Sequence, residues 1–339
     1  MNKIRIIAEV GPNHNGSFEM ALDYIKKLSK YDLDIIKFQL ASPEDVYSKD
    51  SFKADYQKIN DKSKTVIEMS KKNQLSREEH LKLSNECLKY NKIYAVTAFD
   101  IDNLKFINKN INLPFLKIPS GEVCSIDLLD FIKSTNKEVL LSTGMSSIDE
   151  IKKTLNYIDP KNNRNITILH CTSSYPAKFE DLNLNFLEQL RSLFPNYKLG
   201  YSDHSIGEEA CLLALAKGAT IIEKHVTIDR DLEGPDHKSS MSIDDFGKFV
   251  NKIRKCETIL GQNKKIISSE QKKIREMALK SIVTLRDIKK GEKLDRTNVC
   301  FKRPGIGINP LELESILGRK LKKDIEADRV IMKEDINYD

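Results

Sequence analysis

The chain has 339 residues, with 56 Lys and Arg against 50 Asp and Glu, so 56 − 50 gives a formal net charge of +6. A composition of 40% hydrophobic and 31% charged residues excludes a largely disordered chain, and the modest basic excess argues against a nucleic-acid partner. No apolar run approaches the roughly 20 residues that span a bilayer, and no long apolar signal region follows the N-terminus, so we expect no membrane partner.

Eight short apolar segments rich in β-branched residues recur along the first 260 residues. They read as continuous rather than alternating runs, which is typical of strands buried on both faces. The segments are Ile4–Val10, Ile35–Leu40, Ile93–Phe99, Phe115–Ser120, Glu138–Thr143, Ile166–Cys171, Lys198–Ser202 and Thr220–Val226.

Amphipathic helical segments separate these predicted strands, and two of them begin with capping boxes, Ser76-x-x-Glu79 and Ser147-x-x-Glu150. Eight strands alternating with helices predict a (β/α)₈ TIM barrel over residues 1–260. A doubly wound open sheet is the alternative, but the Gly11–Gly16 turn has the wrong glycine spacing for its phosphate loop.

Three segments depart from the alternating pattern. The polar stretch Lys53–Lys58 lies in the widest gap between predicted strands and is long enough to form a lid or a wall of a substrate site. Residues 261–280 read as a linker with some helix, and residues 281–339 as a small domain of short strands and turns. A unit of about 60 residues tends to dock onto another surface.

Ionisable and hydrogen-bonding residues gather where the predicted strands end, which is where barrel enzymes place their active sites. A core ion pair would explain any one of them, and it is the favoured explanation for Glu223 and Lys224. It does not explain the whole set at one end of a barrel, because buried charges are costly unless paired or used. The strand-end residues are Glu9, Lys37, Gln39, Thr97, Asp100, Lys117, Ser120, Glu122, Ser142, Thr143, Ser173, Tyr175, Ser202, Asp203, His204, Glu223, Lys224 and His225.

His204 and His225 follow the last two predicted strands, which are neighbours in a barrel, so their rings could converge on one cation. Two imidazoles with open positions suit a divalent ion such as Mn²⁺. His14 and His237 could reach the same rim, whereas His80 lies on a predicted helix and is expected to face solvent.

Lys117 with Ser120, Ser142, Ser173 and Ser202 offers a cation and several hydroxyls, a combination that suits a phosphate held away from water. An alternative use of Lys37 or Lys117 is as the nucleophile of a Schiff-base aldolase, and the residues alone leave it open. The six cysteines form no C-x-x-C pair, which predicts free thiols in a reducing, cytoplasmic compartment.

At these residues the chain resembles the N-acetylneuraminate (sialic acid) synthase family, and its tail, with Lys302-Arg303-Pro304-Gly305, resembles that family's antifreeze-like (SAF) domain. The matching motifs run nearly from end to end. They include Ile7–Gly16, Lys37-Phe38-Gln39, Lys53–Lys58, Lys117–Glu122, Leu141–Met145, His170-Cys171-Thr172, Tyr175-Pro176, Gly200–His204, Glu223-Lys224-His225 and Gly234–Lys238.

The resemblance implies a transferase that condenses phosphoenolpyruvate with N-acetylmannosamine and releases phosphate by C–O cleavage. It implies a divalent metal at His204 and His225, Mn²⁺ first, with Mg²⁺ or Co²⁺ as alternatives. It also implies a domain-swapped homodimer in which Arg303 reaches the N-acyl group of the partner's substrate.

The remaining site residues receive roles from the same resemblance. The implied catalytic residues are Glu122, Lys37 and Glu9. The implied substrate-binding residues are Gln39, Thr97, Lys117, Ser120, Ser142, Ser173, Tyr175, Ser202, Asp236 and Arg303.

The chain departs from the family pattern at three places, which bear on the acceptor more than on the chemistry. Ser173 stands where many members have Asn, Ala98 replaces a usual Pro, and Ser239-Ser240 replaces Ala-Ser. The motifs favour the sialic-type acceptor, and legionaminate or pseudaminate synthesis from a di-N-acylated 6-deoxy sugar, as in related enzymes, is the alternative activity. Two more distant alternatives are a Schiff-base lyase and a carbohydrate-binding protein without turnover.

Overall fold

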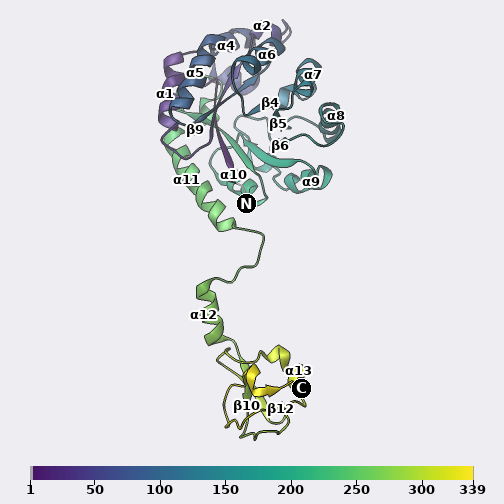
Figure 1. The fold of residues 1–339 in the computed structure, drawn as a ribbon. Helices are drawn as coiled ribbons and strands as arrows, with labels where there is room; N and C mark the ends of the chain where they lie inside the picture. Colours follow the sequence, from purple (N-terminus) through teal and green to yellow (C-terminus); the bar gives the residue numbers. More distant parts are fainter. Residues whose placement is uncertain (1–2, 339) are drawn as a thin grey trace. The chain divides into compact units, whose positions relative to one another are not determined.

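The computed structural model describes residues 3–338, and the chain divides into two compact units, Met1–Gly261 and Gln262–Asp339. The first unit is built around one sheet of parallel strands, and the second contains two short antiparallel pairs (Figure 1). Within the described residues, no helix is both long and apolar enough to cross a membrane.

Eight parallel strands form the first unit, and each begins and ends within two residues of its predicted position. They pair in the order β3-β2-β1-β8-β7-β6-β5-β4, so the predicted TIM barrel is confirmed as a nearly closed barrel. Along the described residues β3 and β4 touch without a hydrogen-bonded ladder. The strands are β1 (Arg5–Gly11), β2 (Ile35–Leu40), β3 (Ile93–Ala98), β4 (Phe115–Ile118), β5 (Glu138–Ser142), β6 (Ile166–Cys171), β7 (Lys198–Asp203) and β8 (Ile221–Thr227).

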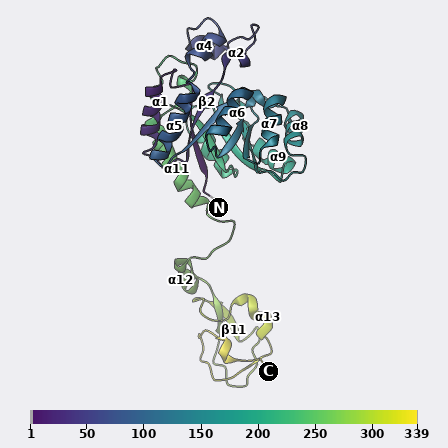
Figure 2. The ribbon, with the colours of Figure 1, turned by 45° about the horizontal axis from the view of Figure 1, so that its top comes forward.

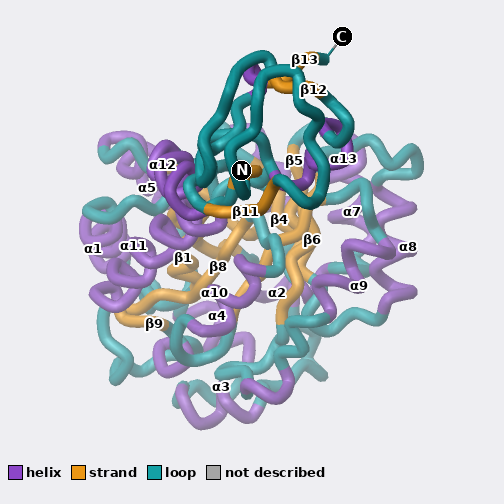
Figure 3. The backbone as a smooth tube through the Cα atoms, turned by 90° about the horizontal axis from the view of Figure 1, so that it is seen from below, coloured by secondary structure: helices purple, strands orange, loops and turns teal. Residues whose placement is uncertain are grey.

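Helices surround the strands, with α1, α5 and α11 along one side and α7, α8 and α9 along the other (Figure 3). Short segments α2, α3 and α4 fill the long connection after β2, and β9 (Met241–Ser242) pairs with β8. The helices are α1 (Phe18–Leu28), α2 (Pro43–Val46), α3 (Asp55–Asn60), α4 (Val66–Lys72), α5 (Arg77–Lys89), α6 (Ile101–Asn110), α7 (Ile126–Ser134), α8 (Ile148–Ile158), α9 (Phe186–Leu193), α10 (Glu209–Ala216) and α11 (Ile243–Leu260).

The two predicted capping boxes are present. In α8 the Glu150 N–H donates to Ser147 Oγ at 3.3 Å, and the Ser147 N–H donates back to the Glu150 carboxylate at 2.7 Å. Ser76 and Glu79 make the same reciprocal pair at the start of α5. These bonds satisfy backbone donors that a helix start leaves free, which fixes where each helix begins.

The barrel has an outer and an inner apolar layer. The outer layer packs the helices onto the strands and contains most of the core. The inner layer is a small ring that closes the interior of the barrel with branched and aromatic side chains. Its members are Ile7, Ile35, Ala95, Phe115, Leu140, Leu169 and Ile221.

The second unit has its own small core. Two antiparallel pairs, β10 with β11 and β12 with β13, hold it together, and α12 lies within the predicted linker 261–280. Figure 2 shows this unit from another side. Its elements are α12 (Ser269–Ala278), β10 (Ser281–Thr284), β11 (Val299–Lys302), α13 (Leu313–Ile316), β12 (Lys320–Leu321) and β13 (Ile336–Asn337).

The expectation that His80 faces solvent is wrong. His80 lies on the buried face of α5, where its Nδ1 is 2.6 Å from Tyr94 Oη and Phe38 packs against both rings. Burial lowers the pKa of His80 to about 3, so the imidazole is neutral. The polar residues around it in the sequence hide that this position faces the strands.

Gly200 tests the packing of the inner ring. A Cβ there would lie 2.4 Å from Leu169 Cδ2 and 3.0 Å from the Ile221 carbonyl oxygen, so Gly200→Ala overpacks a tight contact. We expect the free energy of unfolding to fall by about 1–3 kcal/mol. Urea unfolding followed by circular dichroism measures this, and an unchanged midpoint would contradict the packing.

Candidate functional site

Polar side chains enter the barrel interior one step above the apolar ring. Side chains on a strand alternate between its faces, so the residue two positions after each ring member also points inward. The sequence therefore stacks a reactive layer on an apolar floor. The inward pairs are Ile7 and Glu9, Ile35 and Lys37, Ala95 and Thr97, Phe115 and Lys117, Leu140 and Ser142, Leu169 and Cys171, and Ile221 and Glu223.

This layer borders a cavity of about 300 Å³. Most of the site residues predicted from the sequence line it together. The lining residues are Glu9, Lys37, Gln39, Ala54, Tyr56, Thr97, Phe99, Lys117, Pro119, Ser120, Gly121, Ser142, Met145, Cys171, Ser173, Tyr175, Ser202, His204, Glu223 and His225.

Four buried charged side chains form a connected chain in the polar layer above the apolar ring. Lys37 Nζ lies 2.6 Å from Glu9 Oε2 and 3.6 Å from Glu223 Oε2. Lys117 Nζ lies 3.0 Å and 3.2 Å from the two oxygens of Glu223. Two carboxylates and two ammonium groups sum to zero, which makes burying all four tolerable.

Burial and pairing set the protonation of these groups. Burial raises the pKa of Glu9 to about 7, although Lys37 opposes the shift. Burial also opposes the charge on Lys37, but Glu223 and Glu9 outweigh it and raise the pKa of this lysine. In Glu223 the two lysines outweigh burial and lower the carboxyl pKa, whereas burial lowers the pKa of Lys117 despite Glu223.

Hydroxyl and amide groups gather beside Lys117. Ser120 Oγ accepts from the Gly144 N–H at 3.0 Å and lies 3.2 Å from Cys171 Sγ. Ser202 Oγ donates to Glu223 at 2.9 Å, and Ser142 and Ser173 border the same cavity. Lysines and hydroxyls in a partly closed cavity can hold an anion with phosphate or carboxylate oxygens.

The two predicted metal ligands lie together at the mouth of the cavity, with their ring centroids 5.3 Å apart. His204 Nδ1 lies 2.8 Å from the Thr172 carbonyl oxygen, so this nitrogen carries the proton and donates. The lone pair is then on Nε2, which lies 3.2 Å from Tyr175 Oη. A backbone carbonyl that orients one ring nitrogen is the usual support of a metal-binding histidine.

His225 is also suited to ligation, because burial lowers its pKa well below the usual value and keeps the ring neutral. Its Nδ1 makes no hydrogen bond to a described residue and lies 3.5 Å from Asp236 Oδ2. Over residues 3–338 no group of three or more His, Cys, Asp or Glu side chains forms a ready metal site. The pair thus fits a divalent ion whose other positions belong to water or substrate.

The Lys53–Lys58 segment forms part of the cavity wall. Tyr56 stacks on Tyr175 with centroids 5.1 Å apart, and Tyr175 packs on His204 at 4.3 Å. Lys53 is buried and donates to the Asp61 carbonyl oxygen at 2.7 Å, which pins the segment. This segment thus reaches the metal-candidate histidines through two aromatic rings.

Three predicted site residues lie off the cavity lining. Asp236 is buried beside His225, and burial raises its pKa to about 7, with Glu9 adding to the shift. Glu122 is half-buried, and its carboxylate accepts a hydrogen bond from Ser125. Arg303 is exposed in the second unit.

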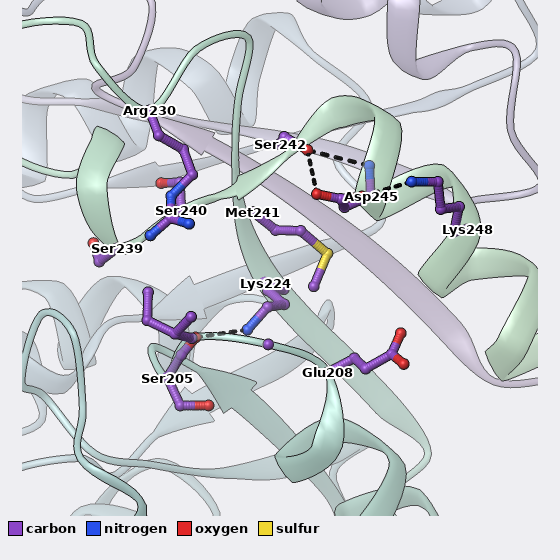
Figure 4. A pocket seen from close by; sticks show the side chains of 12 residues that line it. Ser205, Glu208, Lys224, Arg230, Ser239, Ser240, Met241, Ser242, Asp245 and Lys248 are labelled. Atoms are coloured by element: carbon purple, nitrogen blue, oxygen red, sulfur yellow. Dashed lines mark hydrogen bonds and ion pairs between the residues drawn. The ribbon is translucent and has the colours of Figure 1, made fainter.

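A second cavity of about 280 Å³ lies outside the barrel, between the segments that follow β7 and β8 and the start of α11 (Figure 4). Several of its charged side chains already form ion pairs or hydrogen bonds with neighbouring residues. Lys224 binds Asp203 and the Ser205 carbonyl oxygen, and Lys248 binds Asp245. The four buried charges and the histidine pair line the first cavity instead.

A family model described as the NeuB family matches residues 24–265, and a SAF domain model matches residues 280–337. The chain belongs to the NeuB family. It is 37% identical to the N,N'-diacetyllegionaminic acid synthase of Campylobacter jejuni, covering 98% of this chain and 99% of that protein. It is 32% identical to a pseudaminic acid synthase of Campylobacter jejuni, covering 98% and 96%.

A solved structure supports the same membership. The crystal structure of N-acetylneuraminic acid (sialic acid) synthetase from Leptospira borgpetersenii in complex with citrate matches with a TM-score of 0.72. It is 34% identical and covers 80% of this chain and 90% of that one. The resemblance read from the sequence motifs is confirmed, and the family's named members are sugar acid synthases.

Several lining residues of this NeuB-family site were missed or placed elsewhere by sequence reasoning. Glu223 was read as a core ion pair, and it is one, but it also borders the cavity. The inward alternation from Ile221 through Glu223 to His225 carries a signal for this position. Tyr56 lies in the Lys53–Lys58 segment that the sequence predicts as a lid or wall of the substrate site, and it does line the cavity. Phe99 and Met145, which follow β3 and β5, were not predicted as site residues.

Gly144 tests the hydroxyl cluster. A Cβ there would lie 2.2 Å from Ser173 Oγ, 2.8 Å from Cys171 Sγ and 3.0 Å from Ser120 Oγ. We expect Gly144→Ala to weaken inorganic phosphate binding by at least about tenfold, equivalent to about 1.4 kcal/mol, because the hydroxyls must move. Calorimetric titration measures it.

Gly121→Ala is the matched control, because among the described residues nothing lies within 4 Å of a Cβ built there. Equal phosphate affinity in the two variants would show that the cluster does not bind the anion.

Proposed function

We propose that the protein condenses phosphoenolpyruvate with a di-N-acetylated 6-deoxy hexosamine and releases phosphate. In this reaction C3 of phosphoenolpyruvate forms a bond to the aldehyde carbon of the open-chain sugar. Water then adds at C2, and phosphate leaves with the bridging oxygen as that C–O bond breaks. The observation that carries the proposal is one cavity that joins the buried lysine and hydroxyl cluster to the His204–His225 pair.

The donor substrate would occupy the end of the cavity near Lys117. Its phosphate and carboxylate need cations and hydrogen-bond donors out of water, where such contacts are strongest. Lys37 is held by Thr97 at 3.0 Å as well as by its carboxylates, so its ammonium has a fixed position. Lys117, Ser120, Ser142, Ser173 and Ser202 complete the set proposed to bind the donor.

A divalent ion, which we propose to be Mn²⁺, would supply Lewis acidity toward the aldehyde oxygen when held by His204 and His225. The protein's part is to orient the two rings. The Thr172 carbonyl fixes the tautomer of His204, and Tyr175 packs against both rings at 4.3 Å and 5.8 Å.

Two carboxyl groups, Glu9 in the cavity lining and Glu122 outside it, are proposed to handle protons. Glu9 has a pKa of about 7, so it can give or accept a proton near neutral pH. Lys37 contacts Glu9 Oε2, and Gln39 Nε2 donates a hydrogen bond to Glu9 Oε1 at 2.8 Å, so both carboxylate oxygens are held by side chains that line the cavity. Burial also raises the pKa of Glu122, the residue proposed to manage the attacking water.

The acceptor sugar proposed here differs from N-acetylmannosamine, the acceptor that the sequence motifs imply. The motifs favour that first interpretation, but the relatives that are 37% and 32% identical to this chain carry the names of legionaminic and pseudaminic acid synthases, against 28% for an N-acetylneuraminate-9-phosphate synthase. Ala54, Phe99 and Met145 give the cavity wall apolar surface, which suits acetyl and methyl groups better than hydroxyls. The contact of Arg303 with an N-acyl group in a domain-swapped dimer stays a prediction of the family resemblance.

The Schiff-base alternative needs a neutral lysine. Lys37 has a raised pKa and two carboxylate partners. Burial lowers the pKa of Lys117, and its two contacts with Glu223 oppose the loss of its proton. These pairings favour ammonium groups that bind anions over an amine that attacks a carbonyl.

Phosphate release from phosphoenolpyruvate tests the function directly. We expect release only with an acylated hexosamine present, and a kcat/KM at least about tenfold higher for the di-N-acetylated 6-deoxy sugar than for N-acetylmannosamine. Higher activity with N-acetylmannosamine would restore the first interpretation. Borohydride trapping of pyruvate on a lysine, with activity unaffected by a chelator, would support the lyase instead.

His225→Ala tests the metal ligands separately from turnover. We expect the Mn²⁺ affinity to fall by more than about 100-fold, because loss of a hydrogen-bond partner of a metal ligand already costs up to about that much. Turnover should be lost, and the circular dichroism spectrum should not change. His170→Asn is the control, because His170 binds the Leu182 carbonyl oxygen at 2.7 Å and should not affect the ion. Equal retention of Mn²⁺ by both variants would remove the assignment.

A further inference from the structure

Three of the groups proposed to hold the donor anion share one carboxylate. Lys117 contacts both oxygens of Glu223, Lys37 contacts one of them at 3.6 Å, and Ser202 Oγ donates to the other at 2.9 Å. These groups come from β4, β2 and β7, whereas Glu223 is on β8. Since β4 and β8 are four places apart in the strand order, the Lys117–Glu223 pair spans the barrel interior.

We propose that Glu223 is the positioning residue of the anion site, holding Lys117, Lys37 and Ser202 together so that both lysines are charged and ready for a phosphate or carboxylate. This inference rests on the proposed function, because it takes phosphoenolpyruvate as the anion. It replaces the view that Glu223 is only a core ion pair.

A plain core pair looks different in this same barrel. Lys224 and Asp203 pair on the outward faces of β8 and β7, and Asp203 also accepts hydrogen bonds from Tyr201, Ser205 and Cys211. That carboxylate binds no group proposed for the donor. Within the described residues, the side-chain hydrogen bonds and ion pairs of Glu223, which precedes Lys224, are with side chains that line the cavity.

The charge on Lys117 depends on Glu223 more than on any other neighbour. Burial lowers the pKa of Lys117, and Glu223 is the main group that opposes this effect. Of the other groups that act on it, Lys37 on β2 lowers the pKa further and Cys171 on β6 raises it. The charge of Lys117 also acts on His204, which directly follows β7 and whose own pKa is lowered, mainly by burial.

The direction of the effect follows from these neighbours. In Glu223→Gln the carboxylate that favours an ammonium is gone, while Lys37 continues to repel it. Lys117 then loses its proton at a lower pH than in the wild-type chain, so anion binding weakens as pH rises. A residue that only fills space would change stability without adding this pH dependence.

The experiment compares Glu223→Gln with the wild-type chain between pH 7 and pH 9. It measures the KM of phosphoenolpyruvate, the KM of the acceptor, and calorimetric binding of inorganic phosphate. For each anion we divide the variant's constant by that of the wild-type chain, using KM for phosphoenolpyruvate and Kd for phosphate. We expect this ratio to rise by at least about tenfold from pH 7 to pH 9, since each pH unit above a pKa removes about nine tenths of the remaining charged form. The acceptor ratio should stay flat.

Two further variants separate positioning from folding. Glu138→Gln removes a carboxylate from the ion pair with Arg5 at the other end of the strands, and its anion binding should follow the wild-type pH profile. Glu223→Asp keeps the charge on a shorter side chain and should restore most of the profile. If Glu223→Gln does not fold, Glu223→Asp should still show a smaller shift in the same direction.

The inference is overturned if Glu223→Gln folds and its KM and Kd ratios for the two anions do not change with pH. If Glu223→Gln does not fold, it is overturned when Glu223→Asp binds the anions with the wild-type pH profile. Either result leaves the proposed function intact. A wild-type chain that binds neither phosphoenolpyruvate nor phosphate would instead overturn the proposed function, and the inference with it.

Discussion

The structure depends on four charges buried in the barrel, Glu9, Lys37, Glu223 and Lys117. Each buried ion costs several kcal/mol in lost hydration, and only its partners offset that cost. The four come from β1, β2, β8 and β4, so their pairing ties together the relative register of four strands. A slip of one residue on any of these strands would turn its charged group outward and leave the others unpaired.

The apolar ring beneath these charges gives them their chemical value. Side chains such as Phe115 and Leu140 form an apolar layer below the lysines and hydroxyls, so the proposed substrate anion would meet these groups next to a medium of low polarity. Electrostatic contacts are strongest there, and they need little rearrangement because the lysines are already held. The same alternation along each strand places the floor and the reactive layer two residues apart.

The sequence predicted the fold well, and many of the polar residues that it places at the strand ends border one cavity, because both features depend on local patterns. Apolar runs locate the strands, and the polar residues that end them follow from the parallel barrel. What it could not predict is which charge meets which. Glu223 reaches Lys117 across the interior, a distance in the chain of 106 residues, and that contact exists only once the barrel has closed.

Other differences have the same origin. Tyr56 comes from a connecting segment, and its stacking on Tyr175 depends on how that segment folds back over the barrel. His80 has polar neighbours in the sequence, yet the face of α5 that carries it packs on Phe38 and Tyr94. In both cases the tertiary contact, rather than the local pattern, determines where the side chain lies.

The two faces of β7 and β8 divide the work between stability and chemistry. On the outer face Lys224 binds Asp203 and the Ser205 carbonyl oxygen, the residues on either side of His204. Asp203 also accepts from the Ser205 N–H at 3.0 Å, so the backbone around His204 is held firmly. On the inner face Glu223 and His225 border the cavity. β8 thus carries two residues with different parts. Lys224 holds the backbone on either side of His204, and Glu223 pairs with Lys37 and Lys117 inside the barrel.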